Sequence, residues 1–168
     1  MALVRIYVRD LKGWWMGKIN NLVIIKLAFL FVVFCNAVVD VAHKVLLQNI
    51  AFKVFDGSTQ VIWISLINAL IIIPFLLLFT VSGYLSDKYN KKNILVYGAV
   101  SSFVLSVLMI ISYMSENFYF AMFALFLLAV QSAIYSPAKF GLILDIYGKK
   151  NLSRGNAALQ ANSIIAIL

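Results

Sequence analysis

The chain has 168 residues, of which 64% are hydrophobic and only 12% charged, and its formal net charge is +8. Soluble domains are about half apolar and about a quarter charged, so this composition excludes a soluble globular fold. With a single cysteine and a single histidine, neither a disulfide framework nor a metal centre is expected. The apolar residues form runs long enough to cross a bilayer, which takes about 20 residues. The sequence therefore predicts an all-α transmembrane protein.

The first 20 residues are basic rather than continuously apolar. They include four basic residues and two adjacent tryptophans, namely Arg5, Arg9, Lys12, Lys18, Trp14 and Trp15. This combination is typical of the headgroup layer on the cytoplasmic side of a membrane. We therefore predict a cytoplasmic interfacial segment over residues 1–20. A first helix follows at about 21–52, which is longer than one crossing requires and is therefore expected to tilt.

Four further apolar runs predict four further helices, so that residues 21–168 form a transmembrane bundle. The predicted helices cover about 60–84, 94–114, 118–136 and 155–168. Pro74 lies inside the first of them as a kink that membrane helices tolerate, whereas Pro137 is expected to end the third. A short interfacial helix is expected at 138–148. The last run is too short to cross a bilayer, so we expect a fragment of a longer polypeptide or a truncated protein.

The basic residues lie on alternate connections between the predicted helices. The amino-terminal segment, the loop after the second helix and the loop after the fourth carry four, three and four of the 14 Lys and Arg residues. The opposite turns carry Lys53 alone. Because cytoplasmic loops are enriched in Lys and Arg, we expect a cytoplasmic amino terminus. This orientation and anionic membrane lipids explain the positive charge without a nucleic-acid partner.

Ionisable side chains inside the first predicted helix are candidates for a substrate or ion pathway. Asn36, Asp40 and Lys44 are spaced four residues apart and share one helical face, and His43 lies close to it. Such groups are expensive in a membrane and usually face a water-filled cavity or a partner. Asp40 could contact a substrate or a coupling ion there, or could form a purely structural ion pair with Lys44. His43 could titrate usefully or could simply be a polar lining residue.

The most specific motif is the sequence GYLSDKYNKK at residues 83–92, between the second and third predicted helices. It resembles the signature loop of the major facilitator superfamily, G-x-L-[small]-D-[R/K]-[aromatic]-G-[R/K]-[R/K], at nine of ten positions. The resemblance implies a secondary transporter whose first half contains six helices, five of them present here with the last cut short. The family's substrate site lies near the membrane midplane, between the two halves. The corresponding gate residues are Gly83, Asp87, Lys88, Lys91 and Lys92.

The resemblance also implies a role for the residues of this loop as a cytoplasmic latch. Gly83 would let neighbouring helices approach closely. Asp87 would lie near a helix amino terminus of the other half, where the dipole favours an anion. Lys91 and Lys92 would neutralise Asp87 in one conformation and release it in another. Asn90 replaces the usual glycine, and we expect it to adopt a positive φ. The alternative is a solvated cytoplasmic turn.

A second motif points to one branch of this superfamily. The sequence YSPAKFG at residues 135–141 is similar to the SPAKYG segment of lysophospholipid transporters. The fifth predicted helix begins with a similar R-x-N-A pattern, formed by Arg154, Asn156 and Ala157. Asp40 and Lys44 resemble an acidic residue and a lysine in the first helix of the branch. Val39 and Val41 occupy the neighbouring positions, where the branch often has asparagines.

This second resemblance implies a substrate and a set of partners. Members of the branch move lysophospholipids such as lysophosphatidylethanolamine inward across the bacterial inner membrane for re-acylation. They occur alone or fused ahead of an acyltransferase and an acyl-carrier-protein ligase. The expected partners are therefore membrane lipids, the substrate, and either the remaining transporter half or fused acyltransferase domains. Lys139 could bind a lipid headgroup or could be a positive-inside anchor.

Two other functions remain open at this stage. A major facilitator protein with the same latch could carry another small solute or drug. Alternatively, the chain could be a non-transporting membrane anchor for a fused or partner acyltransferase. An enzymatic role is not expected, because the sequence contains no G-x-S-x-G, H-E-x-x-H or Walker motif.

Overall fold

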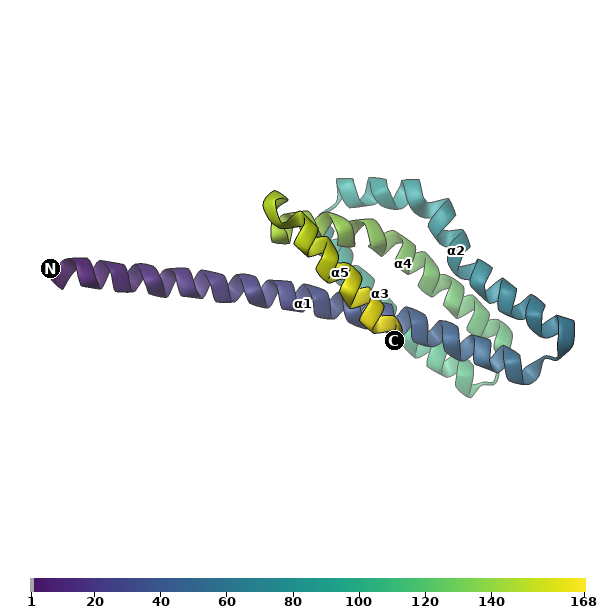
Figure 1. Cartoon of the computed structure of the whole chain (residues 1–168). Coiled ribbons are helices and arrows are strands. Elements are labelled where there is room, and N and C mark those ends of the chain that lie inside the picture. Colours follow the sequence, from purple (N-terminus) through teal and green to yellow (C-terminus); the bar gives the residue numbers. More distant parts are fainter. Residues whose placement is uncertain (1) are drawn as a thin grey trace.

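The computed structural model describes residues 2–168, with side chains described for residues 21–168. Five α-helices and one short 3-10 turn make up nearly all of this backbone, which contains no strand (Figure 1). Their bounds are Ala2–Val54 (α1), Gly57–Lys88 (α2), Lys91–Met114 (α3), Phe118–Tyr147 (α4), Lys149–Asn151 (η1) and Leu152–Ile167 (α5). Helices α1 to α4 are long and apolar enough to cross a membrane. The predicted all-α transmembrane fold is confirmed.

Helix α1 extends well beyond the predicted first helix. It has 53 residues, which at ~1.5 Å per residue gives about 80 Å, whereas the hydrocarbon core is only ~30 Å thick. The stretch able to span the membrane is Asn21–Val54, and the part before it projects from the bundle (Figure 1). The helix continues across the predicted boundary because no proline interrupts it. The side chains of residues 1–20, on which the interfacial prediction depends, lie outside the described ones.

The two prolines of the chain lie inside helices. Pro74 is buried within α2, which bends along its length (Figure 1). Pro137 was predicted to end a helix, and this prediction is wrong because α4 continues to Tyr147. The lost backbone hydrogen bond is offset by packing, since Ala138 and Ile143 just beyond the proline are completely buried. The predicted separate helix at 138–148 is therefore the end of α4.

The junction between α2 and α3 is shorter than the predicted loop. Helix α2 continues to Lys88 and α3 begins at Lys91, so most of the signature sequence is helical. Asn90 does not adopt the predicted positive φ, because its φ is −63°. Its side chain instead accepts a hydrogen bond of 3.0 Å from the backbone N–H of Lys92. Asn90 thus replaces the family's glycine by acting as the amino-terminal cap of α3.

Helix α4 is the central helix of the bundle. It packs against α1, α2, α3 and α5, and more than a third of its residues are buried, including Leu125, Leu128 and Ala133. One core cluster surrounds Leu47 and Ile67, and a second surrounds Val33 and Leu159. The side chains that α4 presents to α1 and α2 are therefore held on a rigid support.

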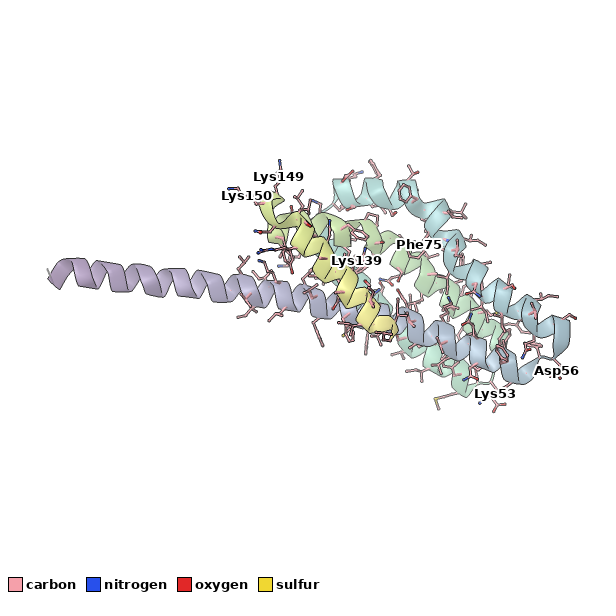
Figure 2. The ribbon with its side chains drawn as sticks, in the orientation of Figure 1. Lys53, Asp56, Phe75, Lys139, Lys149 and Lys150 are labelled. Atoms are coloured by element: carbon pink, nitrogen blue, oxygen red, sulfur yellow. The ribbon has the colours of Figure 1, made fainter. Side chains whose placement is uncertain are left out.

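The connections divide the bundle into two ends with different chemistry. The α2–α3 and α4–α5 junctions lie at the end from which α1 projects, and the α1–α2 and α3–α4 connections lie at the other (Figure 1). Figure 2 shows Lys149 and Lys150 at the first end, and Lys53 and Asp56 at the second. We call the first the basic end, with Lys88, Lys91, Lys92, Lys149 and Lys150. We call the second the aromatic end, with Phe55, Trp63, Phe118 and Tyr119.

Candidate functional site

A small polar cluster lies where α1 meets α4 inside the bundle. The hydroxyl of Ser132 on α4 donates to Oδ2 of Asp40 on α1 at 2.7 Å. The amide Nδ2 of Asn36, one turn before Asp40, lies 3.5 Å from both Asp40 Oδ2 and Ser132 Oγ. We refer to Asn36, Asp40 and Ser132 as the Asp40 cluster. The predicted shared face of Asn36 and Asp40 is therefore real, and α4 supplies the third member.

The hydrogen bonding of the Asp40 cluster is incomplete. Oδ1 of Asp40 and Oδ1 of Asn36 are buried and have no hydrogen-bond partner among the described residues. An unpaired buried polar atom typically costs about 1–3 kcal/mol, and more when it is charged. Both free atoms are acceptors, so the cluster is suited to bind a group that brings hydrogen-bond donors or a positive charge.

A cavity of about 230 Å³ adjoins the cluster. Asp40, Lys44 and Ser132 line it together with apolar side chains of α2 and α4. Figure 2 marks Phe75, one of the α2 residues that contribute to its wall. Within residues 21–168, Asp40 and Lys44 form no ion pair within 4 Å. The two side chains therefore do not form the structural ion pair that their spacing allowed, and both line this cavity.

His43 takes a different direction from Asp40. Its side chain is buried, and its Nδ1 lies 3.4 Å from the hydroxyl oxygen of Tyr113 on α3. The same hydroxyl donates to the backbone carbonyl of His43 at 3.4 Å. Although His43 was grouped with Asp40 from the sequence, it does not line the cavity beside Asp40. It instead ties α1 to α3.

The gate residues lie at the basic end, where α2 ends and α3 begins. Asp87 and Lys88 are exposed in the last turn of α2, and Lys92 is exposed in the first turn of α3. Lys91 reaches from α3 to α4, where its Nζ lies 3.4 Å from Oδ2 of Asp145. Lys91 therefore pairs with Asp145 in this structure and not with Asp87, which it was predicted to neutralise. Sequence reasoning assigned no role to Asp145, although this residue follows the YSPAKFG motif by one turn.

Glycines allow close helix approach at positions other than the predicted one. A Cβ atom at Gly83 would have no atom within 4 Å, so the predicted close approach there is wrong for these helices. At Gly141 a Cβ would lie 2.8 Å from Cε of Lys91, because the lysine stem crosses α4 at this point. At Gly155 it would lie 2.5 Å from Cγ2 of Ile143. Two glycines at the basic end thus hold α3 and α5 against α4.

Lys139 lies within α4 rather than in a loop after it. Seven residues, or two turns, separate it from Ser132, so both occupy the same face of α4. Its Nζ lies 5.2 Å from the centre of the Phe140 ring, and Figure 2 shows it between α4 and α5. The position is compatible with either predicted role, as a headgroup ligand or as a basic anchor.

Comparison with known proteins gives the family. Residues 29–168 match the family described as the Major Facilitator Superfamily, whose members are secondary transporters rather than enzymes. No curated protein and no solved structure matches the chain. The match covers the Asp40 cluster, the signature sequence and the Lys91–Asp145 pair, together with all four membrane-spanning helices except the start of α1. The chain therefore belongs to the Major Facilitator Superfamily, a family of secondary transporters, and is a multi-pass membrane protein.

Proposed function

We propose that the protein moves a lysophospholipid, such as lysophosphatidylethanolamine, across a bacterial inner membrane by alternating access. The observation that carries this proposal is the Asp40 cluster, which contains two unpaired buried acceptor oxygens. Asp40 and Ser132 of this cluster line a cavity that also contains Lys44. A negative and a positive side chain in one otherwise apolar cavity suit an amphiphile whose headgroup has charges of both signs. The YSPAKFG motif and the Arg154-x-Asn156-Ala157 pattern support the lipid branch over other substrates.

In this proposal the first helix supplies most of the polar pathway. Asn36 and Asp40 accept hydrogen bonds from the headgroup, and Lys44 faces its phosphate. His43 supports the pathway from the side, through its contact with Tyr113. Lys139 is a further basic residue on the Ser132 face of α4, and it would meet the headgroup nearer the basic end. The apolar wall formed by Ile71, Phe75, Leu125 and Leu128 is suited to the acyl chain.

The basic end serves as the cytoplasmic gate, with the amino terminus in the cytoplasm. Lys91 and Asp145 hold α3 to α4 through a partly exposed pair, and such pairs contribute only about 0–1 kcal/mol. A contact this weak can break and re-form during a transport cycle. Asp87 is exposed and makes no ion pair with any side chain of residues 21–168, so in this proposal it is available to the other transporter half. Gly83, Lys88 and Lys92 complete this surface.

Labelled lysophosphatidylethanolamine uptake by spheroplasts carrying the full-length gene tests the substrate. Asp40→Asn removes the charge but keeps the size, so uptake should fall by at least an order of magnitude while membrane expression is retained. Asp56→Asn is the matched control, since Asp56 lies in the α1–α2 connection and caps α2 without a side-chain hydrogen bond. Normal uptake by Asp40→Asn would remove Asp40 from the pathway.

The wild-type protein in the same assay separates the alternative functions. Absence of lysophospholipid uptake despite good expression would favour another small solute or drug. If the full-length gene encodes a catalytic domain directly after one more helix, that absence would favour an anchor for a fused acyltransferase.

A second substitution tests the gate independently of the substrate site. Asp87→Asn should lower uptake several-fold with little loss of expression, because it removes the charge that is proposed to engage the other half. The substrate affinity measured by equilibrium binding should stay unchanged, since Asp87 lies at the basic end rather than at the Asp40 cluster. Unimpaired transport by this variant would refute the role of Asp87.

A further inference from the structure

A large cavity lies outside the proposed pathway. It is a groove of about 920 Å³ between α3 and α4, and it begins at the α2–α3 junction. Its α3 wall runs from Asn93 to Leu105, and the 12 steps between these residues give a length of about 18 Å at ~1.5 Å per residue. Half of the hydrocarbon core is about 15 Å thick. The groove therefore extends through about one leaflet of the bilayer, on the side of the basic end.

The lining of the groove changes from polar to apolar along its length. Tyr89, Asn90 and Asn93 lie at the junction, and apolar side chains that include Val104 and Leu127 line the far part. The floor is formed where α3 and α4 touch. There Gln131 donates to the backbone carbonyl of Gly98 at 2.9 Å. The polar mouth and apolar interior match a molecule with a polar headgroup and a hydrocarbon chain.

The surroundings of the mouth indicate that this face contacts lipid. Tyr84, Tyr89 and Tyr97 are all exposed here, and tyrosines of this kind gather at the level of lipid headgroups. The Nζ of Lys88 lies 5.4 Å and 5.7 Å from the ring centres of Tyr84 and Tyr89. This places a positive charge beside the mouth. A lipid phosphate would be attracted to it, by about 1 kcal/mol per basic residue.

We propose that the groove between α3 and α4 binds one acyl chain of an anionic glycerophospholipid of the bilayer, with the headgroup at Asn90 and Asn93. The lipid is a bound partner and not the cargo, because Gln131 and Tyr135 close the floor of the groove toward the bundle interior. Its headgroup meets the residues that cap α3. The site depends only on these contacts, so it does not require the transported substrate to be a lysophospholipid.

Photo-crosslinking tests this site without reference to transport. The full-length protein is placed in vesicles of equal parts phosphatidylcholine and phosphatidylglycerol, with a trace of phosphatidylglycerol carrying a photoreactive acyl chain. Label should concentrate on residues 93–105 of α3 and 127–135 of α4. Excess phosphatidylglycerol should compete several-fold better than excess phosphatidylcholine. Equal competition by the two lipids, or label spread evenly over the outer helix faces, would overturn the proposal.

Two tryptophan variants of α3 provide a matched pair. Val100 lines the groove, whereas Val96 does not, and their side chains are exposed to similar extents, 57% and 51%. Val100→Trp should fill the groove and lower the labelling several-fold, while Val96→Trp should leave it unchanged. Asn93→Glu, which adds a negative charge at the mouth, should lower labelling by phosphatidylglycerol but not by a photoreactive phosphatidylcholine. Equal effects of the two tryptophans, or cross-links to a second copy of the chain in place of lipid, would contradict the site.

Discussion

The two ends of the bundle are held together by different kinds of contact. At the aromatic end, Phe118 of α4 lies 5.2 Å and 5.3 Å, between ring centres, from Phe55 and Trp63. At the basic end, Lys91 pairs with Asp145 at 3.4 Å, and Nζ of Lys26 lies 4.7 Å from the ring centre of Tyr147. Ring packing is apolar and insensitive to salt, whereas the charged contacts are partly exposed and screened.

This difference matters for a protein that must open one end at a time. Aromatic pairs contribute about 0.5–1.5 kcal/mol each beyond the burial of their area, and Phe118 makes several of them. A partly exposed ion pair contributes less. We therefore expect the aromatic end to keep α1, α2 and α4 together as a unit, while the exposed charged contacts of the basic end can break at low cost.

The largest effect is expected from Phe118→Ala. It removes the edge-to-face contacts with Phe55 and Trp63 and should lower the free energy of unfolding by about 2 kcal/mol, from ~0.5–1.5 kcal/mol per aromatic pair. Phe79→Ala is the matched control, because Phe79 is 76% exposed on α2. Unfolding in mixed micelles measures both. If the two variants lose equal stability, the aromatic end has no special role.

The next largest loss of stability is expected from Gly155→Ala at the basic end, with Gly83→Ala as its control. Gly155→Ala places a Cβ 2.5 Å from Ile143 Cγ2 and 2.9 Å from Cγ of Tyr147, so α5 must move away from α4. We expect a loss of about 1–2 kcal/mol, within the range known for overpacking. Gly83→Ala, with nothing within 4 Å, should be neutral or slightly stabilising because alanine favours helix. The same unfolding measurement compares the two, and a reversed order would contradict the close α4–α5 packing.

Hydropathy predicted the helices well where the membrane alone decides the structure. The starts and ends near Val54, Met114 and Phe118 lie within a few residues of the predicted ones, because polar turns must leave the hydrocarbon. The prediction failed at Pro137 and at residues 85–88, where helices continue beyond the apolar run. Local hydropathy contains no signal for such a continuation, which depends on packing by residues such as Ile143.

The candidate site was predictable only within one helix. The spacing of Asn36 and Asp40 placed them on one face, and the structure joins them through Ser132, which lies 92 residues after Asp40. The partner of Lys91 was likewise missed, because Asp145 is 54 residues away. The spacing also grouped His43 with Asp40, whereas His43 contacts the hydroxyl of Tyr113 on α3, away from the Asp40 cavity. Partners on other helices are set by tertiary packing, which no periodicity in a single sequence specifies.

The smallest effect, and the one that best separates a latch from a permanent clamp, is the coupling between Lys91 and Asp145. A double-mutant cycle with Lys91→Gln and Asp145→Asn isolates it, since glutamine keeps most of the lysine stem that lies over Gly141. The side chains are 29% and 53% exposed, so we expect a coupling of about 0.5 kcal/mol, typical of exposed pairs. This coupling should weaken further at high salt.

The matched control is the same cycle with Lys92→Gln, because Lys92 is exposed and forms no ion pair among residues 21–168. Its coupling to Asp145 should be close to zero. A Lys91–Asp145 coupling above about 2 kcal/mol would exceed the usual range for exposed pairs and would make the contact a fixed clamp. The basic end would then be no easier to open than the aromatic end, and the gate would have to lie elsewhere. A small coupling accompanied by altered uptake would instead show that the contact acts on the conformational equilibrium rather than on stability.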